Sequence, residues 1–389
     1  MTPRIGIDYT AAVHEPAGTG RYTREMVQAL ATLPDDMPQF DYRLFVADAG
    51  QVAKSALPGA NFAWCPSRMT FPWSSSRLTE RRLAGLWYRI RLPLWVEGWT
   101  GRLDLFHATD FLLPPVMPGT RTVVTIHDLS FVREPDTALP AMKAHLTKWV
   151  PDALRRADHI IAVSEATRRD LMELYQTPPE KTTVLYHGVG PEFRPVTDSS
   201  RLAGVRQKYR LGERPFILSL GTIQPRKNYQ RLIQAFAQMD SSVELVIVGR
   251  KGWLYDAILD EVTRQNLAER VRFIGFVAEA DLPALYSAAT LFAYPSLYEG
   301  FGMPVLEAMA CGTPVIASNQ SAVPEVIGEA GLLVNPRDVT AIASAMSRLL
   351  SEPTLREQSS HAGRAQAAKF TWTAMATDLL SLYQMLLRK

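Results

Sequence analysis

Two glutamates flank a glycine-bearing loop in the segment EGFGMPVLE. Glu299 precedes the loop, and Glu307 lies in the stretch that follows it. Pro304 near the start of that stretch and Gly312 after its end predict a helix that begins at the loop. The N–H groups of such a loop and helix start can bind phosphate. Because carboxylates repel phosphate, the glutamates would have to accept hydrogen bonds from neutral hydroxyl groups beside it.

A nucleoside diphosphate sugar carries both kinds of group, because its two phosphates lie between a ribose and a second sugar. Four consecutive main-chain amides would bind the diphosphate: Gly300, Phe301, Gly302 and Met303. The alternative interpretation is that Glu299 and Glu307 only complement the positive end of a helix dipole. The pattern therefore indicates either a sugar-nucleotide site or an ordinary helix start.

A basic pair, Arg226 and Lys227, follows another glycine-bearing loop in the segment GTIQPRKN. The pair comes just before a predicted helix, so two cations and a helix N-terminus converge there. Such preorganised charge would stabilise a leaving diphosphate while the sugar becomes oxocarbenium-like. The alternative is a solvated turn. This chemistry requires no divalent ion, and the sequence has no Asp-x-Asp metal motif.

Three further candidates lie in the first half of the chain. His127 directly follows the predicted strand 121–126, and ligands of an open parallel sheet bind at the carboxyl ends of its strands. Gly18 and Gly20 look like the start of a dinucleotide fingerprint, but Thr23 stands where the third glycine should be. The alternatives are a structural histidine and a loop that only caps a helix.

Strands and helices alternate along the whole chain. Strands are expected at 4–8, 41–47, 61–65, 104–108, 121–126, 159–163, 182–186, 215–220, 243–248, 271–274, 290–294 and 331–334. The main helices are expected at 21–33, 138–156, 165–175, 229–239, 279–288, 304–311, 339–350, 354–368 and 372–387. This alternation predicts an α/β fold with two Rossmann-like, doubly wound parallel sheets that face each other across a cleft.

The segment HGVGPEFRPVTDSS is rich in Gly, Pro and Ser, which is typical of a linker. We therefore expect one domain at 1–195, a second at 196–370, and a terminal helix at 371–389 that crosses back to the first domain. The length of 389 residues is sufficient for two domains of ordinary size.

Composition excludes several classes of protein. A formal charge of +3 is too weak to indicate nucleic-acid binding. Cys65 and Cys311 form no disulfide framework and no metal-ligand cluster, which favours two reduced thiols in a cytoplasmic protein. The sequence has no run long enough to span a membrane and no signal-peptide pattern at its start.

The segment 73–99 differs from the rest because tryptophan and arginine interleave in it. Its members are Trp73, Arg77, Arg81, Arg82, Trp87, Tyr88, Arg89, Arg91, Trp95 and Trp99. A helix broken near Pro93 is expected. Interleaved arginine and tryptophan would suit a peripheral contact with an anionic membrane, but also a helix packed on a sheet with a solvated basic side.

The extended segment EGFGMPVLEAMACGTPVIAS closely resembles the donor-binding segment of retaining glycosyltransferases of family 4, the group 1 glycosyltransferases of GT-B fold. The segments GTGRYT, TVVTIHDLSF and GTIQPRKN look closest to the mannosyltransferase-like branch. The resemblance covers nearly the whole chain. It implies transfer of a sugar, preferably mannose from GDP-mannose, to a glycan or lipid-linked acceptor in the synthesis of a cell-surface polysaccharide or O-antigen. It implies no cofactor.

The resemblance also implies a role for each candidate residue. Glu299 would hold a hydroxyl of the transferred sugar, Glu307 the ribose hydroxyls, Arg226 and Lys227 the diphosphate, and His127 the sugar from the other domain. Gly18 and Gly20 would approach the diphosphate, and the backbone at Gly249 and Val277 would contact the base. Many members have an arginine at the position of Thr222, so Arg226 would substitute for it.

In this family the N-terminal domain binds the acceptor and the C-terminal domain binds the nucleotide sugar. The chief alternative is a non-catalytic module that binds a nucleotide sugar or glycan on the same fold. A phosphorylase-like enzyme would need a lysine that carries pyridoxal phosphate. A nucleotide-dependent oxidoreductase is disfavoured by the incomplete glycine fingerprint.

Overall fold

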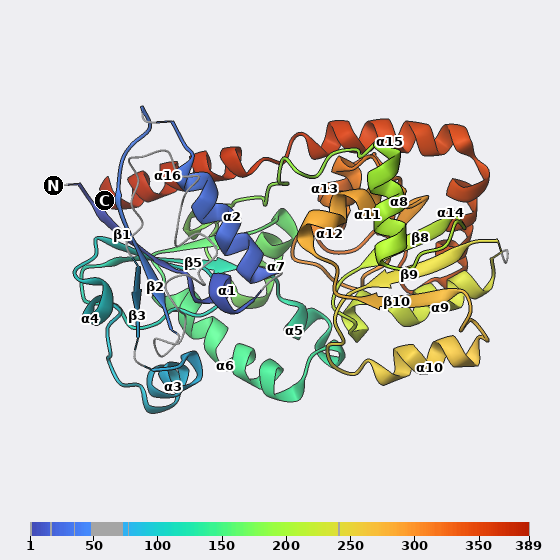
Figure 1. Cartoon of the computed structure of the whole chain (residues 1–389). Coiled ribbons are helices and arrows are strands. Elements are labelled where there is room, and N and C mark those ends of the chain that lie inside the picture. The colour runs from blue at the N-terminus through green and yellow to red at the C-terminus, as the bar shows by residue number, and fades with distance from the viewer. Residues whose placement is uncertain are drawn as a thin grey trace. The chain divides into compact units, whose positions relative to one another are not determined.

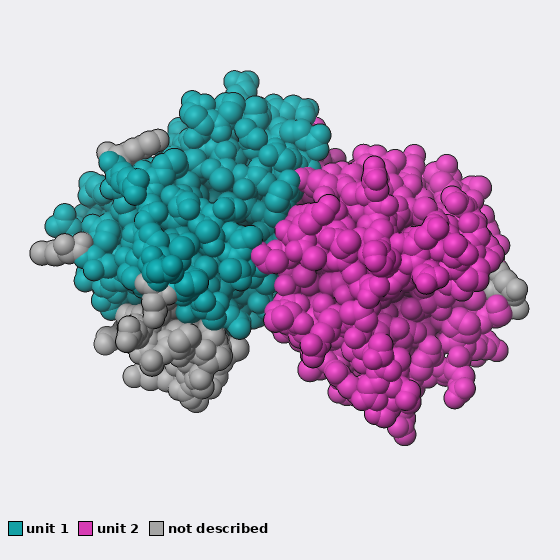
Figure 2. Space-filling model, turned by 90° about the horizontal axis from the view of Figure 1, so that it is seen from above, with its two compact units in different colours: residues 1–129, 144–188, 372–389 teal, residues 130–143, 189–371 magenta. Residues whose placement is uncertain are grey.

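The computed structural model describes residues 2–15, 18–34, 36–47, 73–76, 78–239 and 242–388. Strands and helices alternate along the chain, as the ribbon in Figure 1 shows. The chain forms two compact units, which Figure 2 distinguishes by colour. Unit 1 comprises Met1–Leu129, Ala144–Gly188 and Trp372–Lys389, and unit 2 comprises Ser130–Lys143 and Val189–Thr371.

Unit 1 contains a seven-stranded parallel sheet with the strand order β3-β2-β1-β4-β5-β6-β7. The strands are β1 (Arg4–Asp8), β2 (Asp41–Val46), β3 (Trp73–Ser75), β4 (Leu105–Ala108), β5 (Arg121–Ile126), β6 (His159–Ala162) and β7 (Thr182–Val184). The helices are α1 (Thr10–His14), α2 (Thr19–Ala31), α3 (Glu80–Ala84), α4 (Glu97–Thr100), α6 (Pro140–Arg156), α7 (Glu165–Tyr175) and α16 (Trp372–Arg388), with the π-helix η1 (Gly85–Ile90) and the 3₁₀-helix η3 (Pro179–Lys181).

Unit 2 contains a six-stranded parallel sheet with the order β10-β9-β8-β11-β12-β13. The strands are β8 (Phe216–Leu220), β9 (Glu244–Val248), β10 (Val271–Gly275), β11 (Leu291–Tyr294), β12 (Val315–Ser318) and β13 (Leu332–Val334). The helices are α5 (Ser130–Arg133), α8 (Ser199–Lys208), α9 (Tyr229–Ala237), α10 (Asp256–Arg264), α11 (Leu282–Ala288), α12 (Met303–Ala310), α13 (Val323–Ile327), α14 (Val339–Ser351) and α15 (Pro353–Ala367). Three 3₁₀-helices complete the unit: η2 (Pro135–Thr137), η4 (Pro225–Lys227) and η5 (Glu279–Asp281).

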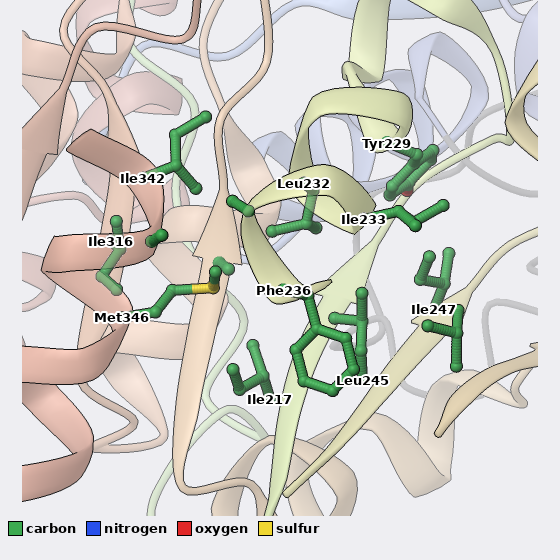
Figure 3. Close-up of a cluster of buried hydrophobic side chains, with 14 of the residues drawn as sticks. Ile217, Tyr229, Leu232, Ile233, Phe236, Leu245, Ile247, Ile316, Ile342 and Met346 are labelled. Carbon is green, nitrogen blue, oxygen red and sulfur yellow. The ribbon is translucent and has the colours of Figure 1, made fainter. Parts of the chain in front are cut away.

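The core of unit 2 follows from the apolar pattern of its elements. The strands β8 and β9 read FILSL and ELVIV and are almost wholly buried, as expected for a parallel sheet covered on both faces. Helix α9 presents Leu232 and Phe236, four residues apart on one face, to this sheet. Figure 3 shows these side chains beside Ile217 and Leu245.

The strand order reverses once in each sheet. In unit 1 the reversal lies between β1 and β4, and in unit 2 it lies between β8 and β11. The loops that leave the two neighbouring strands diverge at such a switch point, and ligands of open α/β sheets bind there, at the carboxyl ends of the strands. The topology therefore marks one ligand-binding edge in each unit.

The structure confirms the expected α/β class and parallel sheets, but it corrects segment 73–99. This segment is not one helix broken near Pro93. It forms β3, α3, the π-helix η1 and, after an extended stretch, α4. Arg91, with a φ of 60°, ends η1 in the left-handed conformation, which stops a helix before the proline is reached. The expected strand at 61–65 lies outside the described residues, and β12 and α8 are among the elements that were not expected.

The units also group some residues differently from the expected ranges 1–195, 196–370 and 371–389. Residues 130–143 and 189–195 belong to unit 2. Two contacts hold the first of these segments: the ion pair of Glu134 with Arg337 at 2.5 Å, and a 2.7 Å hydrogen bond from Trp253 Nε1 to the carbonyl of Thr137. Val189 N donates to the carbonyl of Phe370 at 3.1 Å.

We predict that Phe236→Ala lowers the free energy of unfolding of unit 2 by about 3–5 kcal/mol, because it leaves a cavity in the buried core. Phe276→Ala, which truncates an exposed ring in the same unit, is the matched control and should cost about 1 kcal/mol or less. Urea titration followed by circular dichroism measures both values. Equal effects of the two substitutions would contradict this assignment of the core.

Candidate functional site

Two loops meet at the switch point of unit 2, one after β8 and one after β11. Asn228 joins them, because its side-chain amide donates to the carbonyls of Pro295 at 2.9 Å and Pro336 at 2.6 Å. Leu297 N donates to the carbonyl of Arg226 at 2.9 Å, and the Ser296 hydroxyl oxygen lies 3.0 Å from the same carbonyl oxygen. These bonds fix the first loop, which ends in η4, against the second.

The three charged residues predicted from the sequence lie together at this junction. Lys227 Nζ is 2.7 Å from Glu299 Oε1, and Arg226 Nη1 is 3.1 Å from Glu299 Oε2. All three side chains are largely buried. Lys227 also donates to the hydroxyl of Tyr294 at 2.5 Å, and Arg226 donates to the carbonyl of Tyr298 at 2.7 Å. The cluster carries two positive charges and one negative charge, so its net charge favours an anion.

The environment of Glu299 keeps its carboxylate ionised. Burial by itself would raise the pKa of Glu299, but the charges of Lys227 and Arg226 act in the opposite direction. Hydrogen bonds from Lys227 and from Ser296, whose hydroxyl donates to Oε1 at 2.5 Å, add to this effect. The net result is a pKa of about 2. Glu299 therefore accepts hydrogen bonds and donates none at neutral pH.

The loop after Glu299 leads into α12. Gly302 is the N-cap residue of this helix, with a φ of 109°, and Met303 is its first residue. Gly300 and Phe301 are buried, and the Phe301 ring packs against Phe370 with 5.8 Å between centroids. The N-terminus of α12 thus lies at the same switch point as the charged cluster, and a helix start of this kind suits an anionic group.

Glu307 occupies the fifth position of α12 and is buried. Its Oε2 accepts a 2.9 Å hydrogen bond from the hydroxyl of Tyr286 on α11. The role expected for Glu307, binding ribose hydroxyls, stays a prediction. Tyr286 was missed by the sequence analysis, and no local pattern singles it out.

Gly249 and Val277 follow β9 and β10, at the same edge of the sheet. A Cβ atom on Gly249 would lie 2.0 Å from the carbonyl oxygen of Gly221, so the close approach of two loops requires glycine here. Val277 is buried, whereas the neighbouring Phe276 is 54% exposed and lies under the guanidinium of Arg250 at 4.8 Å. The expected contact of this backbone with a base remains a prediction.

Gly18, Gly20 and His127 belong to unit 1. Gly18 is the N-cap residue of α2. A Cβ atom on Gly20 would lie 2.0 Å from the carbonyl oxygen of Glu15, so this glycine allows α2 to begin against the preceding loop. Tyr22 of the same helix packs edge-on against the His127 ring, with 4.9 Å between centroids.

His127 is buried at the end of β5, and it is neutral. Burial lowers the pKa of His127. Its hydrogen bond with Thr109 and the charge of Asp128 raise the pKa, but they offset this lowering only in part. His127 Nε2 lies 2.8 Å from the carbonyl oxygen of Thr109. Because a carbonyl only accepts hydrogen bonds, Nε2 carries the proton and Nδ1 is an acceptor.

Residues 205–366 match the family model "Glycosyl transferases group 1", and residues 16–193 match the model "Glycosyltransferase Family 4". The chain belongs to this family, as the sequence analysis predicted.

Its relatives include the O-antigen chain mannosyltransferase B of Escherichia coli, which is 34% identical over 95% of this chain and 96% of that protein. A D-inositol 3-phosphate glycosyltransferase of Salinispora arenicola is 29% identical over 93% of this chain and 82% of that protein.

Solved structures confirm the GT-B fold. Sucrose-phosphate synthase of Thermosynechococcus elongatus has a TM-score of 0.74 at 22% identity, and the comparison covers 99% of each chain. Anabaena HepE in complex with UDP and glucose has a TM-score of 0.75 at 19% identity and covers 99% of this chain and 100% of that chain. In the described part of our chain, no helix is both long and apolar enough to cross a bilayer.

The low pKa of Glu299 predicts how stability depends on pH. The pKa of Glu299 is lower in the folded protein than in the unfolded chain, so its contribution is complete above about pH 4.5 and is lost as the pH falls toward about 2. We expect Glu299→Gln to remove on the order of 3 kcal/mol more unfolding free energy at pH 7 than at about pH 2.5. Denaturant titrations at both pH values measure the difference.

Glu357→Gln is the matched control, because Glu357 is an exposed glutamate on α15 of the same unit. It should change stability little at either pH. A Glu299→Gln effect that is the same at both pH values would show that the ion cluster does not set the pKa of this carboxylate.

Proposed function

We propose that this protein transfers mannose from GDP-mannose to a glycan or lipid-linked acceptor in the synthesis of a cell-surface polysaccharide such as O-antigen. The observation that carries the proposal is the meeting of Glu299, Arg226 and Lys227 at the switch point of unit 2. The mannosyltransferase name of the Escherichia coli relative, which matches along nearly its whole length, supports mannose as the sugar.

In the proposed complex, the diphosphate binds to Arg226, Lys227 and the amide groups at the start of α12. Both cations already contact a carboxylate, so the incoming phosphates share them with Glu299. The preorganised positive charge attracts the phosphates, and this attraction becomes stronger as the leaving group becomes more negative. Glu299 remains ionised beside them and accepts a hydrogen bond from a hydroxyl of the transferred sugar, while Glu307 accepts from the ribose.

We propose that the reaction retains the anomeric configuration and proceeds without a metal ion. Glu299 supports retention by attack from the same face, because two cations hold this carboxylate and lower its pKa, which makes it a weak nucleophile. A double displacement needs a carboxylate placed to attack the sugar. Arg226 and Lys227 would neutralise the leaving diphosphate in place of a divalent cation.

We further propose that the protein is cytoplasmic and rests on the inner face of the cell membrane through part of segment 73–99. The segment divides into two groups of apolar residues. Trp87 is buried and donates from Nε1 to the carbonyl of Leu94 at 2.8 Å. The other group is exposed and lies within six residues: Ile90 at 62%, Leu92 at 41%, Leu94 at 36% and Trp95 at 42%.

Four exposed arginines lie in the same segment: Arg81, Arg82, Arg89 and Arg91. Cationic side chains beside a short exposed apolar loop suit the interface of an anionic bilayer, where the apolar groups enter the headgroup region. A lipid-linked acceptor would be presented at this surface.

The transfer reaction tests the site directly. Lys227→Ala and Glu299→Ala should each lower kcat/KM at least ~100-fold, because each leaves buried opposite charge uncompensated where the leaving group develops. Lys369→Ala, an exposed lysine of unit 2, is the matched control and should retain the wild-type rate. The assay measures release of nucleotide and of glycosylated product, and NMR of the product reports its anomeric configuration.

Normal activity in either site variant would remove this assignment. Donor binding without hydrolysis or transfer by the wild-type protein would instead support the non-catalytic module. Thermal-shift screening with GDP, UDP and ADP sugars tests the base, and a rate that is abolished by EDTA would contradict metal independence.

Vesicle binding tests the membrane contact. The double substitution Ile90→Ser and Trp95→Ser should weaken binding to vesicles with phosphatidylglycerol more than about tenfold, because it removes two large apolar side chains from the exposed loop. Leu254→Ser removes an exposed leucine of unit 2 and should have little effect. Equal binding of all three proteins in flotation assays would contradict a contact through this loop.

A further inference from the structure

The switch point of unit 1 has its own acidic side chains, which the proposed role of unit 2 does not use. Asp8 is the last residue of β1, and Asp110 lies two residues after the end of β4. These neighbouring strands are the pair between which the strand order reverses. On the far side of β4, strand β5 ends next to His127. Asp110 therefore lies where a ligand of this sheet would bind.

Asp110 is partly buried, and one of its side-chain oxygens is fully shielded from solvent. Its Oδ1 atom is buried and has no hydrogen-bond partner within the described ranges. Glu97, by contrast, accepts bonds from the amide of Met117 and from the hydroxyl of Thr120. A buried polar atom without a partner is costly, and native proteins contain few of them. An oxygen of this kind at a ligand-binding edge is explained by a ligand that supplies the missing hydrogen bond.

The backbone holds Asp110 in this position. Phe111 N donates to the carbonyl of Thr125 on β5 at 3.0 Å, which ties the loop to the neighbouring strand. Phe111 has a φ of 43°, an uncommon value for a bulky residue, and its ring packs against His127 with 5.7 Å between centroids. The loop that carries Asp110 thus also forms one wall around His127.

The surroundings of Asp110 favour an uncharged ligand. Burial, and to a smaller extent the charges of Glu15, Asp8, Glu80 and Asp128, raise the pKa of Asp110 to about 8. At pH 7 the carboxyl is therefore largely protonated, so it can donate one hydrogen bond and accept others. Burial also raises the pKa of Asp8 and of Glu15, and the nearby His127 is neutral. Acidic groups on several sides would repel a phosphate or a carboxylate.

We propose that Asp110 binds a hydroxyl group of an uncharged sugar at the end of the acceptor and positions that sugar on unit 1. This inference rests on the proposed function, because it identifies the acceptor side of the same reaction. A sugar hydroxyl both donates and accepts, so it can satisfy Oδ1 and also receive the carboxyl proton. Asp110 is a positioning residue that sets the affinity for the acceptor.

Steady-state kinetics with GDP-mannose as donor and methyl α-mannoside as acceptor test the inference. Asp110→Ala should raise the KM for the acceptor at least ~10-fold and leave the KM for the donor unchanged, because only the acceptor loses a partner. Asp110→Asn should raise it less than about threefold, because the amide also donates and accepts. Asp378→Ala, which truncates an exposed aspartate on α16 of unit 1, is the matched control and should behave as the wild type.

The pH profile separates this role from a merely structural one. In the wild type, the KM for methyl α-mannoside should rise above about pH 8, where Asp110 loses its proton. In Asp110→Asn this rise should be absent, because the amide does not titrate. The mannoside 6-phosphate should be the poorer acceptor for the wild type, since acidic groups surround the carboxyl.

The outcomes distinguish failure of this inference from failure of the proposed function. A wild-type protein that transfers no sugar from any nucleotide sugar overturns the proposed function, and the acceptor role with it. Transfer with an unchanged acceptor KM in Asp110→Ala overturns the inference alone. If Asp110→Ala does not fold, the pH profile of Asp110→Asn tests the inference instead. If the acceptor KM of Asp110→Asn rises above about pH 8 as much as that of the wild type, the inference is overturned.

Discussion

Opposite charges on two loops determine the arrangement of unit 2. The cations Arg226 and Lys227 leave β8, the carboxylate of Glu299 leaves β11, and both loops are short enough to bring these groups within 3.1 Å. Buried charges are unfavourable unless paired and hydrogen-bonded on most sides. Ser296, Tyr294 and the carbonyl of Tyr298 provide the remaining bonds. The order of the strands is thus coupled to the chemistry of the loops, because β8 and β11 are neighbours in the sheet.

The two units differ in the kind of group that they present at their ligand-binding edges. Unit 2 presents a cluster with an excess of positive charge beside a helix start, which suits a diphosphate. Unit 1 presents groups that burial keeps uncharged: His127, and Asp110 at neutral pH. This division suits the proposed transfer, in which one substrate carries the leaving charge and the other offers a neutral hydroxyl as the nucleophile. Burial sets the protonation state of these groups in unit 1, whereas ion pairing sets the protonation state of Glu299 in unit 2.

The sequence predicted the features that depend on spacing along the chain. The alternation of strands and helices was sufficient to predict a parallel sheet in each half of the chain, although β3 and β12 were not expected. The glycine-bearing loops marked Arg226, Lys227 and Glu299. Contacts between distant segments could not be predicted in this way. Tyr286 reaches Glu307 from another helix, and Asn228 binds carbonyls more than 60 residues away. Tyr294 and Ser296 could have been predicted as site residues from the sequence, since they lie where β11 ends. The left-handed Arg91 gave no signal, because any non-glycine residue can occupy that conformation at a modest cost.

The chain passes between the units four times: after Leu129, Lys143, Gly188 and Thr371. Unit 1 is therefore assembled from three separate stretches of chain, and its sheet packs partly on α16, whose Tyr383 hydroxyl lies 2.7 Å from His107 Nδ1 of β4. During synthesis on the ribosome, α16 emerges only after the whole of unit 2. The unit that begins first is consequently the last to be completed, and the buried hydrogen bond between Tyr383 and His107 can form only after translation reaches this helix.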